Sequence, residues 1–218
     1  MLCLLVWAAS NPVVAGCYDK REAGMDWSGC KKTGKMLDES NFSGSRFDSA
    51  NLMMSNLDES NFKGASLIKT NMTRVTARRS RFEGADMTKS AGYRAVFDGA
   101  ILKNTNLTKS EYFRASFRDT KITKTDWSKS ELGRVDFSAA QLDEVSFRFS
   151  NVSRVIFNEA KLKNVDFRGA YTYLTHFENV DLRKVMNLSQ IQVDLSCGNQ
   201  DTRLPEGRWM PDTWPCVE

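Results

Sequence analysis

The chain has 218 residues, of which 41% are hydrophobic, and a formal net charge of +4 at pH 7. This composition agrees with one soluble domain of ordinary size. The positive charge argues against an acidic, DNA-like surface, and the single histidine, His176, has no second ligand at metal-site spacing.

Residues 1–16 resemble the end of a secretory signal peptide. They contain an apolar run from Leu2 to Ala9 and then small residues up to Gly16. The positively charged n-region that usually begins a signal peptide is missing. Eight apolar residues are too few to span a bilayer. The segment predicts an exported protein, periplasmic or secreted.

A lipoprotein signal is the alternative interpretation of the same segment. Residues 14–17, Val-Ala-Gly-Cys, have the form of a lipobox, which would make Cys17 a lipid anchor. Asn11 and Pro12 separate the apolar run from this box. That separation disfavours the lipid anchor.

Residues 35–186 repeat every five residues without an insertion or deletion. Of the 30 positions found by counting every fifth residue from Leu37, 27 are large and apolar, the exceptions being Ala77, Gly92 and Thr172. The residue two positions before each of these is Ala, Ser, Thr or Val in 29 of 30 cases. Strands repeat every two residues and helices every 3.6, so the period instead indicates a solenoid of stacked units.

Units such as 60–64 (Ser-Asn-Phe-Lys-Gly) and 85–89 (Ala-Asp-Met-Thr-Lys) resemble the pentapeptide-repeat family. The resemblance implies an all-β fold, a right-handed quadrilateral β-helix with four units in each twenty-residue coil. The large residue and the small one before it would point inward. Thirty units make about seven and a half coils. Residues 26–30 and 197–205 are also similar to exported family members of alphaproteobacteria.

An open solenoid needs caps, because its end coils expose strand edges and apolar side chains. We assign the N-terminal cap to residues 17–34 and the C-terminal cap to residues 187–218. In the latter, Leu188 and Ser189 open a short helical stretch over 190–195, with Gly198 as its stop. The side chains expected to cover the last coil are Leu204, Pro205, Trp209, Pro211, Trp214 and Pro215.

Residues twenty apart in the sequence should lie above one another in successive coils, which sorts the predicted interior into columns. The column with Gly92 and Thr172 should be the most loosely packed. Another column should form a continuous aromatic ladder of Phe97, Phe117, Phe137, Phe157 and Phe177.

Loss of the leader removes Cys3 and leaves four cysteines, one pair at each end of the rod. The rod separates the two pairs, so only two bridges are geometrically reasonable. We therefore predict the disulfides Cys17–Cys30 and Cys197–Cys216.

We predict no enzymatic activity, no cofactor and no metal. The sequence has no phosphate-binding glycine loop and no nucleophile–base constellation. Paired catalytic carboxylates need a cleft, which a convex rod does not offer.

One outward pattern singles out a possible binding surface. Successive coils place basic residues at two corners, with Tyr93 and Phe113 stacked between them. Such a surface suits a polyanion. The residues are Arg74, Arg94, Arg114, Arg134 and Arg154 at one corner and Lys69, Lys89, Lys109 and Lys129 at the other.

Duplication of a coil would also copy these basic residues without any selection for binding. Neighbouring charges about 5 Å apart repel by roughly 0.8 kcal/mol in water, which a fold tolerates without a ligand. The first hypothesis is therefore a non-catalytic, exported interaction or structural module that presents its rod to an unidentified macromolecular partner. The alternative is a polyanion-binding protein. The best-known family members are acidic DNA mimics that protect gyrase, and the charge of this chain departs from that pattern.

Overall fold

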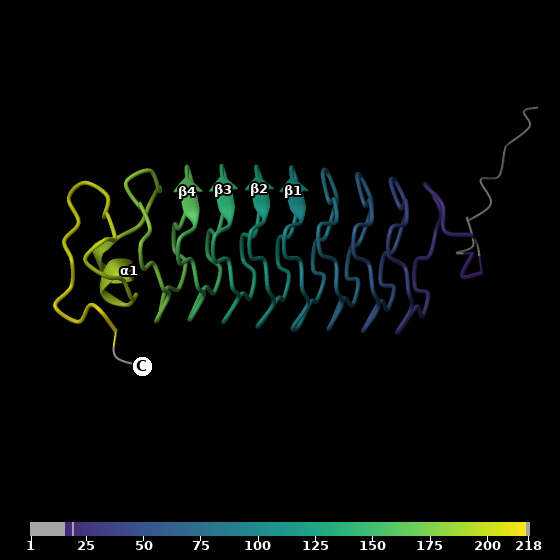
Figure 1. The fold of residues 1–218 in the computed structure, drawn as a ribbon, viewed down its shortest axis with the longest axis horizontal. Helices are drawn as coiled ribbons and strands as arrows, with labels where there is room; N and C mark the ends of the chain where they lie inside the picture. Colours follow the sequence, from purple (N-terminus) through teal and green to yellow (C-terminus); the bar gives the residue numbers. More distant parts are fainter. Residues whose placement is uncertain (1–15, 19, 217–218) are drawn as a thin grey trace, which may run out of the picture.

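The computed structural model describes residues 16–18 and 20–216, which wind into a right-handed, four-sided β-helix (Figure 1). Parallel backbone bridges join residues twenty apart, as in Asn41↔Asn61 and Asn61↔Arg81. Four short strands form one parallel sheet in the order β1-β2-β3-β4, also in a twenty-residue register. They are β1 (Ile101–Lys103), β2 (Lys121–Thr123), β3 (Gln141–Asp143) and β4 (Lys161–Lys163). The predicted fold is confirmed.

Each five-residue unit turns at its fifth residue, which adopts a left-handed backbone conformation. Lys89 and Arg94 have φ angles of 58° and 54°. Side chains rarely accept this conformation, but here the amide of each corner is held by the next coil. The amide of Lys89 donates to the carbonyl of Thr108 at 3.0 Å, and that of Arg94 to Phe113 at 3.1 Å. One backbone geometry therefore recurs at each corner.

Most buried Ser and Thr in the small inward column donate to a backbone carbonyl of the preceding coil, while Ser90, Thr120 and Ser150 donate within their own coil. The hydroxyl of Ser80 donates to the carbonyl of Leu57 at 2.7 Å, and that of Thr70 to Phe47 at 2.7 Å. An unpaired buried hydroxyl would cost about 1–3 kcal/mol. This repeated bond explains why the column accepts hydroxyl side chains as readily as alanine.

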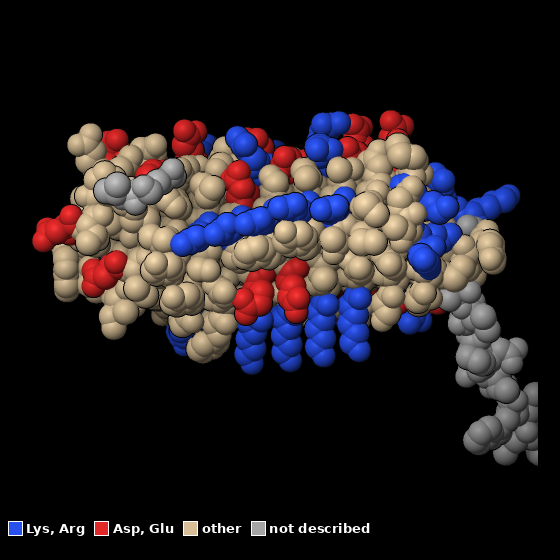
Figure 2. Space-filling model, turned by 90° about the horizontal axis from the view of Figure 1, so that it is seen from below, with Lys and Arg blue, Asp and Glu red and all other residues tan. Residues whose placement is uncertain are grey.

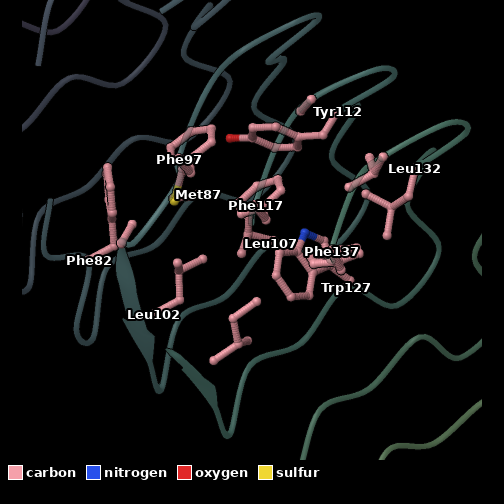
Figure 3. Packing of buried hydrophobic residues seen from close by; sticks show 14 of the residues in the cluster. Phe82, Met87, Phe97, Leu102, Leu107, Tyr112, Phe117, Trp127, Leu132 and Phe137 are labelled. Carbon is pink, nitrogen blue, oxygen red and sulfur yellow. The ribbon is translucent and has the colours of Figure 1, made fainter. Parts of the chain in front are cut away.

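The predicted phenylalanine ladder is present and fully buried. Figure 3 shows its members Phe97, Phe117 and Phe137. The Phe97 and Phe117 rings lie 4.7 Å apart at an interplanar angle of 3°, and Phe117 and Phe137 lie 5.3 Å apart. Phe157 and Phe177 continue the stack at 5.3 and 5.5 Å. The ladder forms a central part of the core.

The prediction of loose packing beside Gly92 and Thr172 is wrong. The ring of Tyr112 from the next coil fills the space that a side chain at Gly92 would occupy. Tyr112 is buried, its hydroxyl lies 2.8 Å from Ser90 Oγ, and burial raises its pKa. Thr172 is also buried and donates to the carbonyl of Gln192 at 2.8 Å. A ring from the neighbouring coil thus compensates for the missing side chain.

We expect the single change Gly92→Ala to destabilise the protein by about 1–3 kcal/mol through overpacking against Tyr112. In a variant that also carries Tyr112→Leu, which removes the ring, Gly92→Ala should leave the free energy of unfolding unchanged or raise it. Urea denaturation of both single variants and the double variant would measure a coupling of about 1–2 kcal/mol. Additive effects of the two changes would contradict the packing described here.

The coil geometry begins earlier than the assigned boundary at residue 35. The bridges Asp26↔Arg46 and Lys31↔Asn51 already follow the twenty-residue register. Trp27 and Cys30 are buried where the repeat places its large and small residues. The ammonium of Lys32 lies 3.7 Å from the centre of the Trp27 ring and covers it from the open end. The N-terminal segment therefore continues the β-helix and also covers its N-terminal end.

The Cys17–Cys30 disulfide is present, with Cα atoms 5.5 Å apart. It engages the sulfur of Cys17 that a lipid anchor would need. The predicted signal-like segment lies outside the described residues, apart from Gly16.

The C-terminal segment contains the helix α1 (Gln190–Asp194), close to the predicted stretch. Its N-cap is Ser189, which forms a reciprocal capping box with Gln192. The helix ends at Leu195, so Gly198 is not its stop. Gly198 instead lies directly beneath the Trp214 ring, which leaves no room for a side chain. The role predicted for this glycine is wrong because a tertiary contact, not the helix end, requires it.

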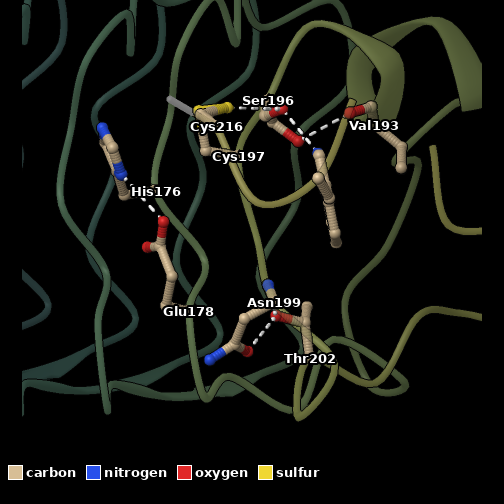
Figure 4. The surroundings of a disulfide bond; sticks show 9 residues. His176, Glu178, Val193, Ser196, Cys197, Asn199, Thr202 and Cys216 are labelled. Carbon is tan, nitrogen blue, oxygen red and sulfur yellow. Dashed lines mark hydrogen bonds and ion pairs between the residues drawn. A yellow bond between two sulfur atoms is a disulfide. The ribbon is translucent and has the colours of Figure 1, made fainter. Parts of the chain in front are cut away.

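Residues beyond α1 add a last partial coil. The amide of Phe177 donates to the carbonyl of Cys197 at 2.9 Å, and that of Leu182 to Arg203 at 2.8 Å. Trp214 covers this coil and donates from Nε1 to the carbonyl of Ser196 at 2.6 Å. The second disulfide, Cys197–Cys216, joins the same layer to the end of the chain (Figure 4). These contacts close the C-terminal end of the rod.

Trp209 does not take part in this cover, contrary to the prediction, because 64% of its surface is exposed. In the described part of the chain, no helix has the length and apolar character that a membrane crossing requires.

Candidate binding face

Two rows of basic side chains mark opposite edges of one rod face. We call them the Arg ridge and the Lys ridge. Figure 2 shows a continuous basic band along the rod and a second basic row at its lower edge, with acidic side chains between them. The Arg ridge comprises Arg74, Arg94, Arg114, Arg134 and Arg154, and the Lys ridge comprises Lys69, Lys89, Lys109 and Lys129.

The backbone explains why each row is straight. All nine residues occupy the left-handed corner conformation, with φ between 54° and 61°. The bridges Ala91↔Glu111, Glu111↔Glu131 and Glu131↔Asn151 keep the coils of this face in register. All nine side chains are exposed. Equivalent corners therefore project their charges in the same direction.

Within the described residues, none of the nine ridge side chains forms an ion pair with a carboxylate. Arginines elsewhere on the rod often do: Arg78 lies 3.3 Å from Asp58 and Arg81 lies 2.7 Å from Glu83. Arg183 hydrogen-bonds to Asp181 and holds the pKa of that carboxyl at about 2. The two ridges thus carry a positive charge that close acidic partners do not neutralise.

Aromatic side chains adjoin the Arg ridge. The rings of Tyr93 and Phe113 are stacked as predicted, 6.1 Å apart at 5°, and are 36% and 41% exposed. The guanidinium of Arg94 lies 5.2 Å from the centre of the Tyr93 ring, and that of Arg114 lies 5.5 Å from Phe113. Phe113 also leans over the next coil, where only a glycine, Gly133, leaves room for it. The rings therefore hold two of the five arginines in place.

The two ridges do not merge into a single basic stripe. Glu111 and Glu131 are exposed in the column between the aromatic residues and the Lys ridge. Glu131 accepts a hydrogen bond from the side chain of Asn151 at 2.9 Å and contacts neither ridge through an ion pair. An anion should therefore prefer the Arg ridge with its adjoining rings, since carboxylates screen the Lys ridge on that side.

Sequence reasoning missed a second aromatic pair at the C-terminal end of this face. Tyr171 and Tyr173 are 51% and 41% exposed, and their rings lie 6.2 Å apart at 10°. Tyr173 falls in the same column as Tyr93 and Phe113. Continuing the twenty-residue count past Ser153 would have found it.

Other surface features are less distinctive. One open groove of about 610 Å³ lies beside Lys124, Glu144, Arg148 and Asp166. Its charges compensate each other, because Lys124 pairs with Glu144 at 3.9 Å and Arg148 with Asp166 at 3.7 Å. His176 Nδ1 lies 2.9 Å from Glu178. The described residues contain no group of three or more His, Cys, Asp or Glu placed to hold a metal ion.

Comparison with solved structures finds the same fold at low sequence identity. A trypsin-treated variant of QnrB1, a plasmid-mediated fluoroquinolone resistance protein, is 16% identical with a TM-score of 0.58, over 85% of this chain and 92% of that chain. A second QnrB1 variant is 17% identical with a TM-score of 0.50, over 81% and 89%. HetL, a pentapeptide repeat protein involved in heterocyst differentiation regulation in the cyanobacterium Nostoc, is 18% identical with a TM-score of 0.43, over 88% and 92%. At identities this low, the two QnrB1 matches establish the fold alone.

Sequence comparison agrees with this result. The family model for pentapeptide repeats matches residues 36–64, 55–90 and 140–171, with eight copies. The search of curated proteins found no match. The unbroken five-residue frame, the twenty-residue parallel register and the family match together show that this chain belongs to the pentapeptide-repeat family.

Proposed function

We propose that this protein is a non-catalytic, exported interaction module that holds a macromolecular partner along one face of its rod. The observation that supports this most is the Arg ridge, whose five cations lie in register without acidic partners and beside exposed rings. Arg and aromatic residues are the types that contribute most to binding at protein interfaces. The inward positions are filled by the core, so the outward columns remain for function.

Two disulfides are compatible with an oxidising compartment, which supports export as part of the proposal. A secreted or periplasmic location would place the rod among envelope components. The disulfides also close both ends of the solenoid, which suits a protein that must persist without cytosolic chaperones.

The alternative, a polyanion-binding protein, is favoured by the same unpaired charges. We expect the protein to be retained on heparin, with retention that weakens as salt rises. The triple change Arg94/Arg114/Arg134→Ala should release the protein at clearly lower salt. The control Arg78/Arg81/Arg118→Ala removes the same charge from arginines that already pair with acids elsewhere. Equal retention of the two triple variants would contradict a role for the Arg ridge.

Site-specific crosslinking tests the interaction module without assuming an anionic partner. A photoreactive residue at Ser153, beside the Arg ridge, should give a discrete adduct in the native envelope. The same residue at Ser138, on a different face, should not. Equal labelling from both positions, or none from either, would overturn the assignment of the binding face.

A further inference from the structure

We propose that the Arg ridge binds a linear polysaccharide that carries one carboxylate on each sugar. This inference rests on the polyanion-binding alternative above and names the class of its ligand. It starts from the spacing of the five arginines, which occupy five consecutive coils at one corner. Adjacent parallel strands are roughly 4.8 Å apart, so the ridge offers one cation at each such step.

The spacing of the cations fits a chain of acidic sugars. A sugar ring in an extended polysaccharide is about as long as one coil step, so the carboxylates that face the ridge would fall at multiples of the arginine spacing. The planar guanidinium can bind a carboxylate through two parallel hydrogen bonds. None of the five arginines uses this capacity on an acid of its own chain in the described structure.

The rings supply the second half of such a site. The apolar C–H faces of sugars pack against aromatic side chains, and Phe113 and Tyr173 are both 41% exposed in one column. They are three coils apart, on the order of 14 Å at the usual strand spacing. Between them lie Gly133, which Phe113 covers, and Ser153. The Phe113 ring fills the space above Gly133, so a bound chain would pass from this ring over the small side chain of Ser153, beside Arg154, to Tyr173.

The same geometry disfavours duplex nucleic acid. Duplex DNA carries one charge for each 1.7 Å or so of its axis, far more densely than one arginine for each coil. A wider polyanion would also reach Glu111 and Glu131, which lie between the two ridges and would repel it. A single, narrow chain along the Arg ridge avoids both carboxylates.

Calorimetric titration of the purified full-length protein would test this proposal. The probes are an oligogalacturonate longer than the ridge, its uncharged methyl ester, and an oligothymidylate of equal charge. We expect binding of the acid but not of the ester. Arg94/Arg114/Arg134→Gln should weaken binding by roughly 30-fold or more, because three charge-assisted pairs are lost. The slope of log affinity against log salt should fall by about two.

Two control variants separate a built site from general attraction. Arg78/Arg81/Arg118→Gln changes the net charge equally and should alter affinity by no more than about threefold, since exposed charges at a distance are screened. Phe113→Ala should weaken binding of the oligogalacturonate roughly fivefold without changing the salt slope, because it removes a stacking surface and no charge. Thermal unfolding of each variant confirms that it is folded.

The outcomes distinguish the ligand class from the underlying function. Equal loss in the two arginine variants, or equal binding of acid and ester, would overturn the acidic-sugar site. Tighter binding of oligothymidylate through the same arginines would overturn the sugar but keep the polyanion function. Binding of neither probe would overturn both, while crosslinking from Ser153 would still support a protein partner.

Discussion

Replacing Phe117 with alanine is expected to destabilise the protein by about 3–5 kcal/mol. Phe117 lies in the middle of the ladder and contacts rings above, below and beside it. Its ring centre is 4.7 Å from Phe97, 5.3 Å from Phe137, 5.8 Å from Tyr112 and 5.6 Å from Trp127. The change would leave a cavity that a rod of parallel coils cannot close, because backbone hydrogen bonds fix the coil spacing.

Urea denaturation, followed by far-ultraviolet circular dichroism, would measure the loss. The matched control is Phe149→Ala, since Phe149 is 57% exposed on the outside of the rod. We expect that control to change the free energy of unfolding by no more than about 1 kcal/mol. Similar losses for the two phenylalanines would contradict the ladder as a main source of stability.

Removing the C-terminal disulfide with Cys197→Ser and Cys216→Ser is expected to cost about 3 kcal/mol, in line with its 19-residue separation. The loss should be local at first, because a solenoid contacts its neighbours only coil by coil. We expect the last partial coil to open while the middle of the rod stays closed.

Hydrogen exchange would detect this local opening. The amide of Cys197 donates to Thr175 and that of Arg203 to Val180, so both should lose protection in the double variant. The amide of Phe117, which donates to Asp136 in the middle of the rod, should keep its protection. Equal loss at all three amides would show that the rod unfolds as one unit and would contradict a local role for the cap.

The sequence predicts the interior of this protein well, because a fixed coil of twenty residues determines which inward side chains lie next to each other. Once four units make a coil, each inward residue has known neighbours twenty positions away, as the Phe97-to-Phe177 ladder shows. The prediction failed at Gly92, where counting along one column could not show that the ring of Tyr112 leans into the neighbouring coil.

The ends were harder to predict for a similar reason. Gly198 follows a helix and has the usual appearance of a helix stop, yet Trp214 packs onto it from sixteen residues further along. Trp209 and Trp214 are alike in sequence context, but only Trp214 covers the last coil. No period relates these residues, so their contacts depend on how an irregular loop folds back.

The five-residue repeat and its resemblance to the pentapeptide-repeat family predict the β-helix, its twenty-residue register and the two basic columns. The placement of two cysteines at each end of the rod predicts their pairing. Within the repeat, position in the chain is equivalent to position in space. The tertiary structure adds that none of the nine ridge side chains pairs with an acid within the described residues, and that Arg94 and Arg114 lie against exposed rings. Those features depend on the directions of long side chains, which the repeat leaves free and which packing across neighbouring coils sets.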